Sequence, residues 1–227
     1  MAASRYLDLK YPVVARSGYQ NELAEYLTSA MFGGTGSLLD LGCGRGALLE
    51  AFARCGHDVV GVDIHKDRHP DALLVDLSDP LPFEDGSFDF VFTKSVIEHL
   101  PDPLFTLAES CRVLRPGGTV VAMTPSWKHT GASIFYTEYT HVRPFTLPSL
   151  REALTLAGFS EARVDYFWQL PILWRRPWLQ PLTLLPRLAR LPYRPLSGAP
   201  WPEAMNKQVR FAREVMLLAA ARKPTLS

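Results

Sequence analysis

The sequence has little cysteine and no excess of charge of either sign. Its 24 lysines and arginines balance 23 acidic residues, which leaves a formal net charge of +1. Binding to a phosphate backbone draws on a positive surplus, so we expect no nucleic-acid partner. The three cysteines, Cys43, Cys55 and Cys111, include no Cys-x-x-Cys pair, so neither a disulfide framework nor a zinc site is indicated. A reducing, cytoplasmic compartment fits this usage best.

Long apolar runs are also missing. No stretch approaches the roughly 20 uncharged apolar residues that a membrane-spanning helix needs. The first ten residues show no apolar core of a secretory signal. A chain of 227 residues suffices for one α/β domain with an appended element but is short for two domains. We therefore expect a single domain over residues 1–227, opening with a helical segment at 1–36.

Strand-like and helical segments alternate along the chain. Helical spacing of apolar residues predicts helices at 19–32, 47–54, 103–114 and 147–157, and a loop is expected after Thr124. Short apolar runs predict strands at 37–41, 59–63, 73–75, 89–93, 119–123, 162–166 and 214–221. This alternation indicates a mainly parallel sheet with helices on both faces and ligands at the carboxyl ends of its strands.

The segment 167–210, between the last two expected strands, differs in composition from the rest. It is rich in proline, tryptophan, leucine and arginine, and residues 167–202 include no acid. Three interpretations remain: a cap over a substrate cleft, a peripheral contact with an anionic membrane, and a homodimer contact. The proline density argues against a long amphipathic helix. We favour the cap.

A glycine-rich turn follows the first expected strand. Gly42, Gly44 and Gly46 would let the backbone approach a ligand just before a helix N-terminus, at a spacing one residue shorter than in dinucleotide-binding turns. A tight turn without a ligand would explain the glycines alone. Three carboxylates, those of Asp40, Asp63 and Asp76, should gather at the same edge of the sheet, and a ligand explains the whole set better.

These segments resemble a known family. Residues 38–46 resemble the first motif of class I S-adenosylmethionine-dependent methyltransferases, and residues 60–63 resemble the second. Residues 81–89, 96–100 and 113–118 are similar to later motifs of the ubiquinone-type, methyltransferase-11-like branch. The resemblance covers roughly residues 37–166, with the motifs in the family's order. It implies a Rossmann-like fold with a mainly parallel seven-stranded sheet and an antiparallel C-terminal strand.

The resemblance also implies a cofactor and its contacts. S-adenosylmethionine would bind and leave as S-adenosylhomocysteine. Asp40 and the three glycines would hold its amino-acid end, and Asp63 its ribose hydroxyls. The adenine would lie at Asp76 and the Leu77 backbone, and the segment from Ser95 to His99 would lie near the sulfonium. The charge pattern agrees, because a cationic ligand can use Asp40 whereas a pyrophosphate favours a helix N-terminus free of acids.

The acceptor side is less sharply defined. Methyl transfer needs alignment and exclusion of water, and a base only where the acceptor is a hydroxyl. Among His99, His129 and His141 we expect His141 to be that base, because residues 141–146 follow the fifth strand and resemble a motif of sugar and natural-product methyltransferases. Anchoring of the next helix is an equal alternative for His141, and a structural or cofactor-pocket contact is expected for His99. The remaining histidines are expected to be ordinary loop residues: His57, His65, His69 and His129.

Two acceptor chemistries are disfavoured. The Asn/Asp-Pro-Pro-Tyr signature of many amino-group methyltransferases is absent, since the fourth strand ends at Thr93-Lys94-Ser95. A catechol-type metal site would need carboxylates near the strand ends, which Lys94, Thr124 and Ser126 do not supply. We therefore expect metal-free O-methylation of a small metabolite, sugar or natural-product intermediate. The alternatives are C- or N-methylation of a lipid-linked or quinone-type acceptor, and a non-catalytic binding protein with this fold.

Overall fold

A seven-stranded sheet runs through the computed structural model, which describes residues 18–65, 69–185 and 203–225. The strand order is β3-β2-β1-β4-β5-β7-β6, and β7 runs antiparallel to the other six strands. This topology confirms the predicted fold class. The strands are β1 (Ser37–Leu41), β2 (Asp58–Asp63), β3 (Leu73–Leu74), β4 (Phe88–Lys94), β5 (Leu114–Pro125), β6 (Ser160–Phe167) and β7 (Met216–Arg222).

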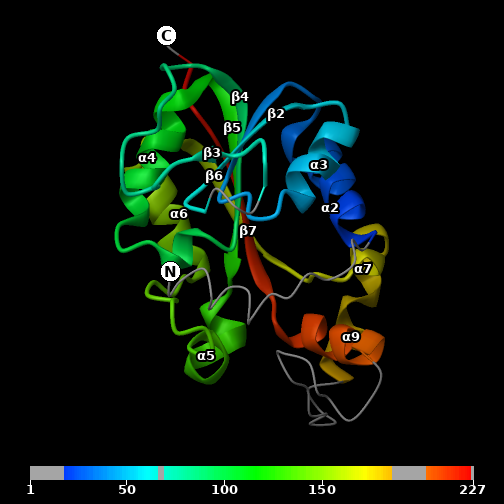
Figure 1. The fold of residues 1–227 in the computed structure, drawn as a ribbon. Coiled ribbons are helices and arrows are strands. Elements are labelled where there is room, and N and C mark those ends of the chain that lie inside the picture. The colour runs from blue at the N-terminus through cyan, green and yellow to red at the C-terminus, as the bar shows by residue number, and fades with distance from the viewer. Residues whose placement is uncertain (1–17, 66–68, 186–202, 226–227) are drawn as a thin grey trace.

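Helices cover both faces of the sheet (Figure 1). On one face lie α4 (Pro103–Val113) and α6 (Leu147–Leu156), and on the other lie α2 (Tyr19–Leu27) and α3 (Ala47–Arg54). Beyond the end of the sheet are α5 (Trp127–Phe135), α7 (Pro171–Arg175) and α9 (Glu203–Arg213). Three further helical segments complete the described elements: η1 (Thr28–Phe32), a π-helix that continues α2, and the 3₁₀ segments η2 (Ile97–His99) and η3 (Pro177–Leu184).

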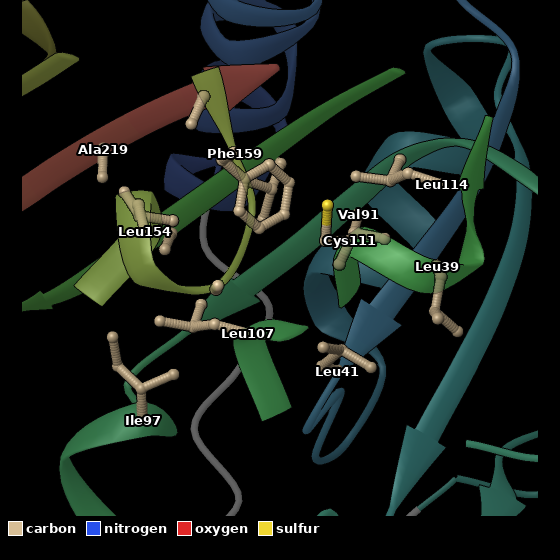
Figure 2. Close-up of a cluster of buried hydrophobic side chains, with 14 of the residues drawn as sticks. Leu39, Leu41, Val91, Ile97, Leu107, Cys111, Leu114, Leu154, Phe159 and Ala219 are labelled. Atoms are coloured by element: carbon tan, nitrogen blue, oxygen red, sulfur yellow. The ribbon is translucent and has the colours of Figure 1, made fainter. Parts of the chain in front are cut away.

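Alternating residues of the central strands supply two buried clusters. In β1, Leu39 points into the cluster that α4 and α6 cover, whereas Leu38 points into the cluster under α2 and α3. Figure 2 shows the first of these clusters, to which Leu107 of α4, Leu154 of α6 and Val91 of β4 all contribute. Because both faces of the sheet are buried, ligands reach it only at the strand ends.

Local sequence signals explain where the helices begin and end. Asp102 accepts hydrogen bonds from the backbone N–H groups of Leu104 and Phe105 and so caps α4, with Pro103 at the first helical position. Thr146 and Ser149 form a capping box at the start of α6. Gly33 ends η1 with a left-handed φ of 72°.

The prediction of a loop after Thr124 is wrong. Residues Trp127–Phe135 form α5, whose backbone is kinked at Gly131, where φ is 57° and ψ is −177°. The helix escapes sequence-based prediction because a glycine breaks its apolar spacing. The strand expected at 119–123 is also longer, since β5 begins at Leu114 immediately after α4.

Two histidines that the sequence assigns to loops are ordered parts of the fold. His57 is only 5% exposed, with its Nε2 3.0 Å from the Thr28 hydroxyl and its ring against Phe32 and Phe52. His129 lies in α5, where its Nδ1 is 3.0 Å from the Ser126 hydroxyl. The loop interpretation is therefore wrong for His129, whereas His57 does lie in the connection between α3 and β2 but is buried there.

The segment between β6 and β7 is only partly described. Its first part forms α7 and η3 and its last part α9, while residues 186–202, like residues 1–17 of the expected N-terminal segment, lie outside the described ranges. Trp174 stacks on Phe167 with ring centroids 5.2 Å apart and packs on Tyr26 of α2. Among the described residues, none of the helices is long and apolar enough to span a membrane.

Candidate functional site

The candidate site lies at the carboxyl edge of the sheet. The parallel strands β1, β2, β4 and β5 all end there, and so does β6, whose last residue Phe167 pairs with the first residue of β7. The glycine turn, Asp63 and the segment after β4 are therefore neighbours in space although they are far apart in sequence.

The glycine turn is folded over the end of β2. The backbone N–H groups of Gly42 and Cys43 both donate to the Val62 carbonyl, at 2.8 and 3.0 Å. Gly44 N–H donates to Asp63 Oδ2 and His65 N–H to Asp63 Oδ1, both at 2.9 Å. Asp63 thus holds the glycine turn with one carboxylate oxygen and the chain after β2 with the other, and it lies where a ribose-binding acid is expected.

Gly42 is needed for a close approach between two parts of the site. Its φ is 73°, and a Cβ atom built there would lie 2.4 Å from Val96 Cγ2. The turn after β1 therefore packs directly on the segment after β4. This contact brings the predicted cofactor turn and the predicted sulfonium segment to one place.

Asp40 is a buried carboxyl at the end of β1, with 3% exposure. Burial, helped by the negative charge of Asp63, raises the pKa of Asp40 to about 7. A positively charged ligand group beside Asp40 would favour its ionised form. The buried acid therefore suits a ligand with an amino or sulfonium group better than a pyrophosphate.

The other residues that the resemblance implies lie further along this edge. The Asp76 side chain is exposed and accepts a hydrogen bond from Ser78 N–H at 2.9 Å, while Leu77 is buried and its carbonyl accepts from the Thr106 hydroxyl. Ser95 is exposed, with a φ of 56° that few non-glycine residues adopt. Backbone strain of this kind concentrates at functional sites.

A buried carboxyl to which the sequence assigns no role of its own lies beside His141. Glu98 is fully buried, and its Oε2 accepts a hydrogen bond from the Thr124 hydroxyl at 2.9 Å. Its Oε1 has no hydrogen-bond partner and lies 4.0 Å from His141 Nε2. Burial raises the pKa of Glu98 to about 7. The sequence does contain one feature that could have pointed to Glu98: it is an acid directly before a histidine, shortly after a buried strand.

His141 is held in one orientation by a backbone carbonyl. Its Nδ1 lies 2.8 Å from the Phe135 carbonyl oxygen, which can only accept, so Nδ1 carries the hydrogen and Nε2 carries the lone pair in the neutral ring. The Glu98 carbonyl accepts from Val142 and Arg143 N–H and fixes the adjoining loop. The rings of His99 and His141 meet edge to face at 4.7 Å.

The segment between β6 and β7 reaches this side of the site. Burial lowers the pKa of Lys94, at the end of β4, with Glu98 opposing this shift and the positive charge of Arg210 adding to it. Arg210 belongs to α9, so the charge of this helix acts on Lys94 at the end of β4. Several large apolar side chains of the segment remain exposed: Ile172, Trp178, Leu182, Leu184, Leu185 and Met205.

Comparison with known proteins fits this geometry. Residues 39–122 match the family described as a methyltransferase domain. The chain carries a class I, S-adenosylmethionine-dependent methyltransferase domain. The recognition from sequence motifs is thereby confirmed, and so is the assignment of S-adenosylmethionine as this domain's cofactor.

Curated relatives match part of this chain. An uncharacterized 37.1 kDa protein in transposon TN4556 of Streptomyces fradiae is 40% identical over 105 residues, which is 40% of this chain and 30% of that protein. A ubiquinone biosynthesis O-methyltransferase of Methylococcus capsulatus is 35% identical over 102 residues, or 38% of this chain and 42% of that enzyme. The chain thus matches less than half the length of each of these relatives.

Solved structures share the fold over nearly the whole chain. A SAM-dependent methyltransferase from Archaeoglobus fulgidus is 20% identical with a TM-score of 0.67, covering 98% of this chain and 100% of that one. A chain from the complex of the Haloferax volcanii Trm112 methyltransferase activator with a methyltransferase is 22% identical, with a TM-score of 0.66 and coverage of 98% and 94%. At these identities the likeness shows the methyltransferase fold alone.

Proposed function

We propose that the protein transfers a methyl group from S-adenosylmethionine to a small-molecule acceptor and that the receiving atom is a hydroxyl oxygen. The proposal depends on one observation: two parts of the site lie together at one edge of the sheet. The glycine turn, which Asp63 holds, contacts Val96 in the segment after β4 through Gly42. One half suits the cofactor, and the segment after Val96 leads directly to a buried acid–histidine cluster on the acceptor side.

In this proposal the cofactor lies along the carboxyl ends of β1, β2 and β4. Asp63 would exchange its hydrogen bonds with the turn for bonds to the two ribose hydroxyls, and Asp40 would face the cationic amino-acid end. Asp76 would serve the adenine. The sulfonium would lie near Ser95 and His99, within reach of the acceptor side.

A hydroxyl acceptor is supported by the chemistry of the neighbouring groups. A hydroxyl must lose its proton as the new bond forms, and the lone pair at His141 Nε2 is a proton acceptor with a fixed orientation. Several of the curated relatives are named ubiquinone biosynthesis O-methyltransferases, and this naming favours oxygen as the receiving atom. The acceptor of those relatives is not carried over.

The acceptor can be sought with a labelled methyl group. The purified chain is incubated with S-adenosylmethionine that carries a deuterated methyl group and with fractions of a small-molecule extract. Mass spectrometry then identifies any compound that gains the label, and fragmentation locates it. We expect the label on oxygen. A label on nitrogen or carbon would contradict the hydroxyl assignment while leaving the methyltransferase activity intact.

A second candidate is a protein that uses the fold without transferring a methyl group. The structure of the [4+2]-cyclase SpnF has a TM-score of 0.61 against this chain and covers 91% of it, so the same fold also serves in a protein named for a different reaction. Under this alternative the chain binds S-adenosylmethionine, yet no compound gains the label and no S-adenosylhomocysteine accumulates.

A further inference from the structure

We propose that Glu98, His99 and His141 form a binding site for one divalent transition-metal ion on the acceptor side of the sheet edge. Each of the three residues offers one ligand atom, and these atoms all lie within 4.8 Å of one another. Glu98 and His99 come from the single turn η2, and His141 comes from the loop that the Glu98 carbonyl holds in place.

The strongest sign of a cation is the arrangement of two acceptors face to face. Glu98 is fully buried, and its Oε1 has no hydrogen-bond partner although Oε2 is paired with Thr124. That oxygen lies 4.0 Å from His141 Nε2, which carries the lone pair in the neutral ring because Nδ1 then donates to the Phe135 carbonyl. Leaving the buried Glu98 Oε1 without a partner is costly, and a cation bound there would relieve that cost.

The spacing suits a metal ion. Metal–ligand bonds of about 2.0–2.2 Å to histidine nitrogen and carboxylate oxygen mean that two ligand atoms on one ion lie at most slightly more than about 4 Å apart. The 4.0 Å between Glu98 Oε1 and His141 Nε2 is within that limit. His99 needs only a small side-chain adjustment from the 4.8 Å bound to complete the set.

Groups behind the ligands hold them as in known metal sites. A metal-bound histidine usually donates its other ring hydrogen to a carbonyl or carboxylate, which fixes the ring. His141 makes this bond to Phe135 at 2.8 Å. The Thr124 hydroxyl holds the second Glu98 oxygen at 2.9 Å. The site therefore has preformed support for two of its three ligands.

The ligand types indicate which ions would bind. Two imidazoles and one carboxylate favour zinc and the neighbouring transition metals over magnesium or calcium, which prefer oxygen ligands. Three protein ligands also leave a position open for a substrate oxygen. The charges of Lys94 and Glu138, which have opposite signs, both act on Glu98. The rival arrangement is therefore a Glu98 satisfied by Lys94 without an ion.

Metal binding would change the role proposed for His141 and revise the metal-free expectation. The same Nε2 lone pair cannot hold an ion and accept a proton. With the ion bound, an acceptor hydroxyl on the open position becomes more acidic and releases its proton to solvent, and its oxygen then bonds to the methyl carbon as the carbon–sulfur bond breaks. Only this consequence rests on the proposed function, because ion binding itself does not require methyl transfer.

A direct binding experiment tests the site. The full chain, freed of any histidine tag and dialysed against chelator, is titrated with Co²⁺ while visible absorption is recorded, and with Zn²⁺ in a calorimeter. We expect about one ion per chain, with binding weakened at least about tenfold in Glu98→Gln and in His141→Gln. His129→Gln is the matched control, because His129 lies at the same sheet edge outside the cluster.

The possible outcomes test the metal site and the methyl-transfer reaction separately. Circular dichroism and S-adenosylmethionine affinity verify that the variants fold, and His99→Gln replaces Glu98→Gln if the latter does not. No ion binding by the wild-type chain, or equal binding by the wild-type chain and the two variants, overturns the metal proposal and leaves the Lys94–Glu98 arrangement. Ion binding without any transfer of the labelled methyl group would sustain the site and contradict the proposed function.

Discussion

Asp63 is the single residue on which the cofactor assignment depends most. Its two oxygens now bond to Gly44 and His65 N–H, and a ribose would compete for the same lone pairs. We expect Asp63→Asn to weaken S-adenosylmethionine binding by about 1.5–3 kcal/mol, roughly ten- to a hundredfold in affinity, because charge-assisted hydrogen bonds contribute that much. Isothermal calorimetry measures the change.

Asp58→Asn provides the control for Asp63. Asp58 begins the same strand at the opposite, exposed end. Its substitution should leave cofactor affinity unchanged. Equal affinity of the wild-type chain and Asp63→Asn would remove Asp63 from the site, and tighter binding of NAD than of S-adenosylmethionine by the wild type would contradict the cofactor assignment for the whole edge.

Asp40 should make stability depend on pH in the direction opposite to an ordinary carboxylate. Its folded-state pKa of about 7 lies above its unfolded value, so the folded chain holds the proton more tightly. Its contribution to stability is therefore complete below about pH 4 and is lost as the pH rises to about 7. Relative to Asp40→Asn, the wild type should lose on the order of 2–4 kcal/mol across this range.

Urea unfolding of the two proteins at about pH 5 and about pH 8 measures this difference. In the comparison with Asp40→Asn, the contributions of the other titrating groups to the pH dependence of the unfolding free energy cancel, since both chains contain these groups. Parallel pH profiles for the two proteins would show that the proton on Asp40 is not favoured by folding. Because a cationic ligand favours the ionised acid, S-adenosylmethionine should also bind more tightly as the pH rises through about 7.

At the scale of elements, the turn after β1 links the two halves of the site through Gly42. Gly42→Ala places a methyl group in left-handed backbone, which costs about 1–2 kcal/mol, and also 2.4 Å from Val96. Gly33 has nearly the same φ, 72° against 73°, but nothing within 4 Å of an added Cβ. Both alanine variants should lose stability in urea unfolding, and only Gly42→Ala should also lose cofactor affinity. Equal affinity in the two variants would separate this turn from the cofactor.

The elements that can be predicted from the sequence are those with a regular local period. Strands such as β1 and β4 are buried apolar runs between turns, and α4 and α6 have capping residues at their starts, so their positions follow from local chemistry. The sequence does not reveal α5, because Gly131 interrupts it. It predicts plain helix for η1, since a π-turn keeps the apolar spacing of the helix that it extends.

At the scale of the whole molecule, parallel topology explains why part of the site could be predicted from the sequence. Asp40 and Asp63 end adjacent parallel strands, so their proximity follows from the fold class alone. Glu98 and His141 belong to different connecting segments rather than to paired strands. The sequence therefore does not indicate that the two residues meet. Their contact depends on the hydrogen bonds from Val142 and Arg143 to the Glu98 carbonyl, which only the folded chain shows.

The role of the segment between β6 and β7 can be separated from that of the sheet. Phe167 and Met216 are direct partners in neighbouring antiparallel strands, so a turn of about four residues can replace residues 168–215 without moving either strand. Loss of the Trp174 contacts with Phe167 and Tyr26 should lower the melting temperature. Cofactor affinity should stay near that of the intact chain, because the glycine turn and Asp63 lie outside the segment.

Methyl transfer by the shortened chain should instead fall on the order of a hundredfold, since the segment starts at the site edge and the charge of Arg210 in α9 acts on Lys94 there. Turnover with the acceptor found by deuterium labelling measures this effect. Sedimentation of the intact chain with anionic vesicles tests the rival role of the exposed Trp178 and its apolar neighbours. An undiminished turnover together with salt-sensitive vesicle binding would assign the segment to a membrane surface, whereas lost turnover without vesicle binding would assign it to the acceptor.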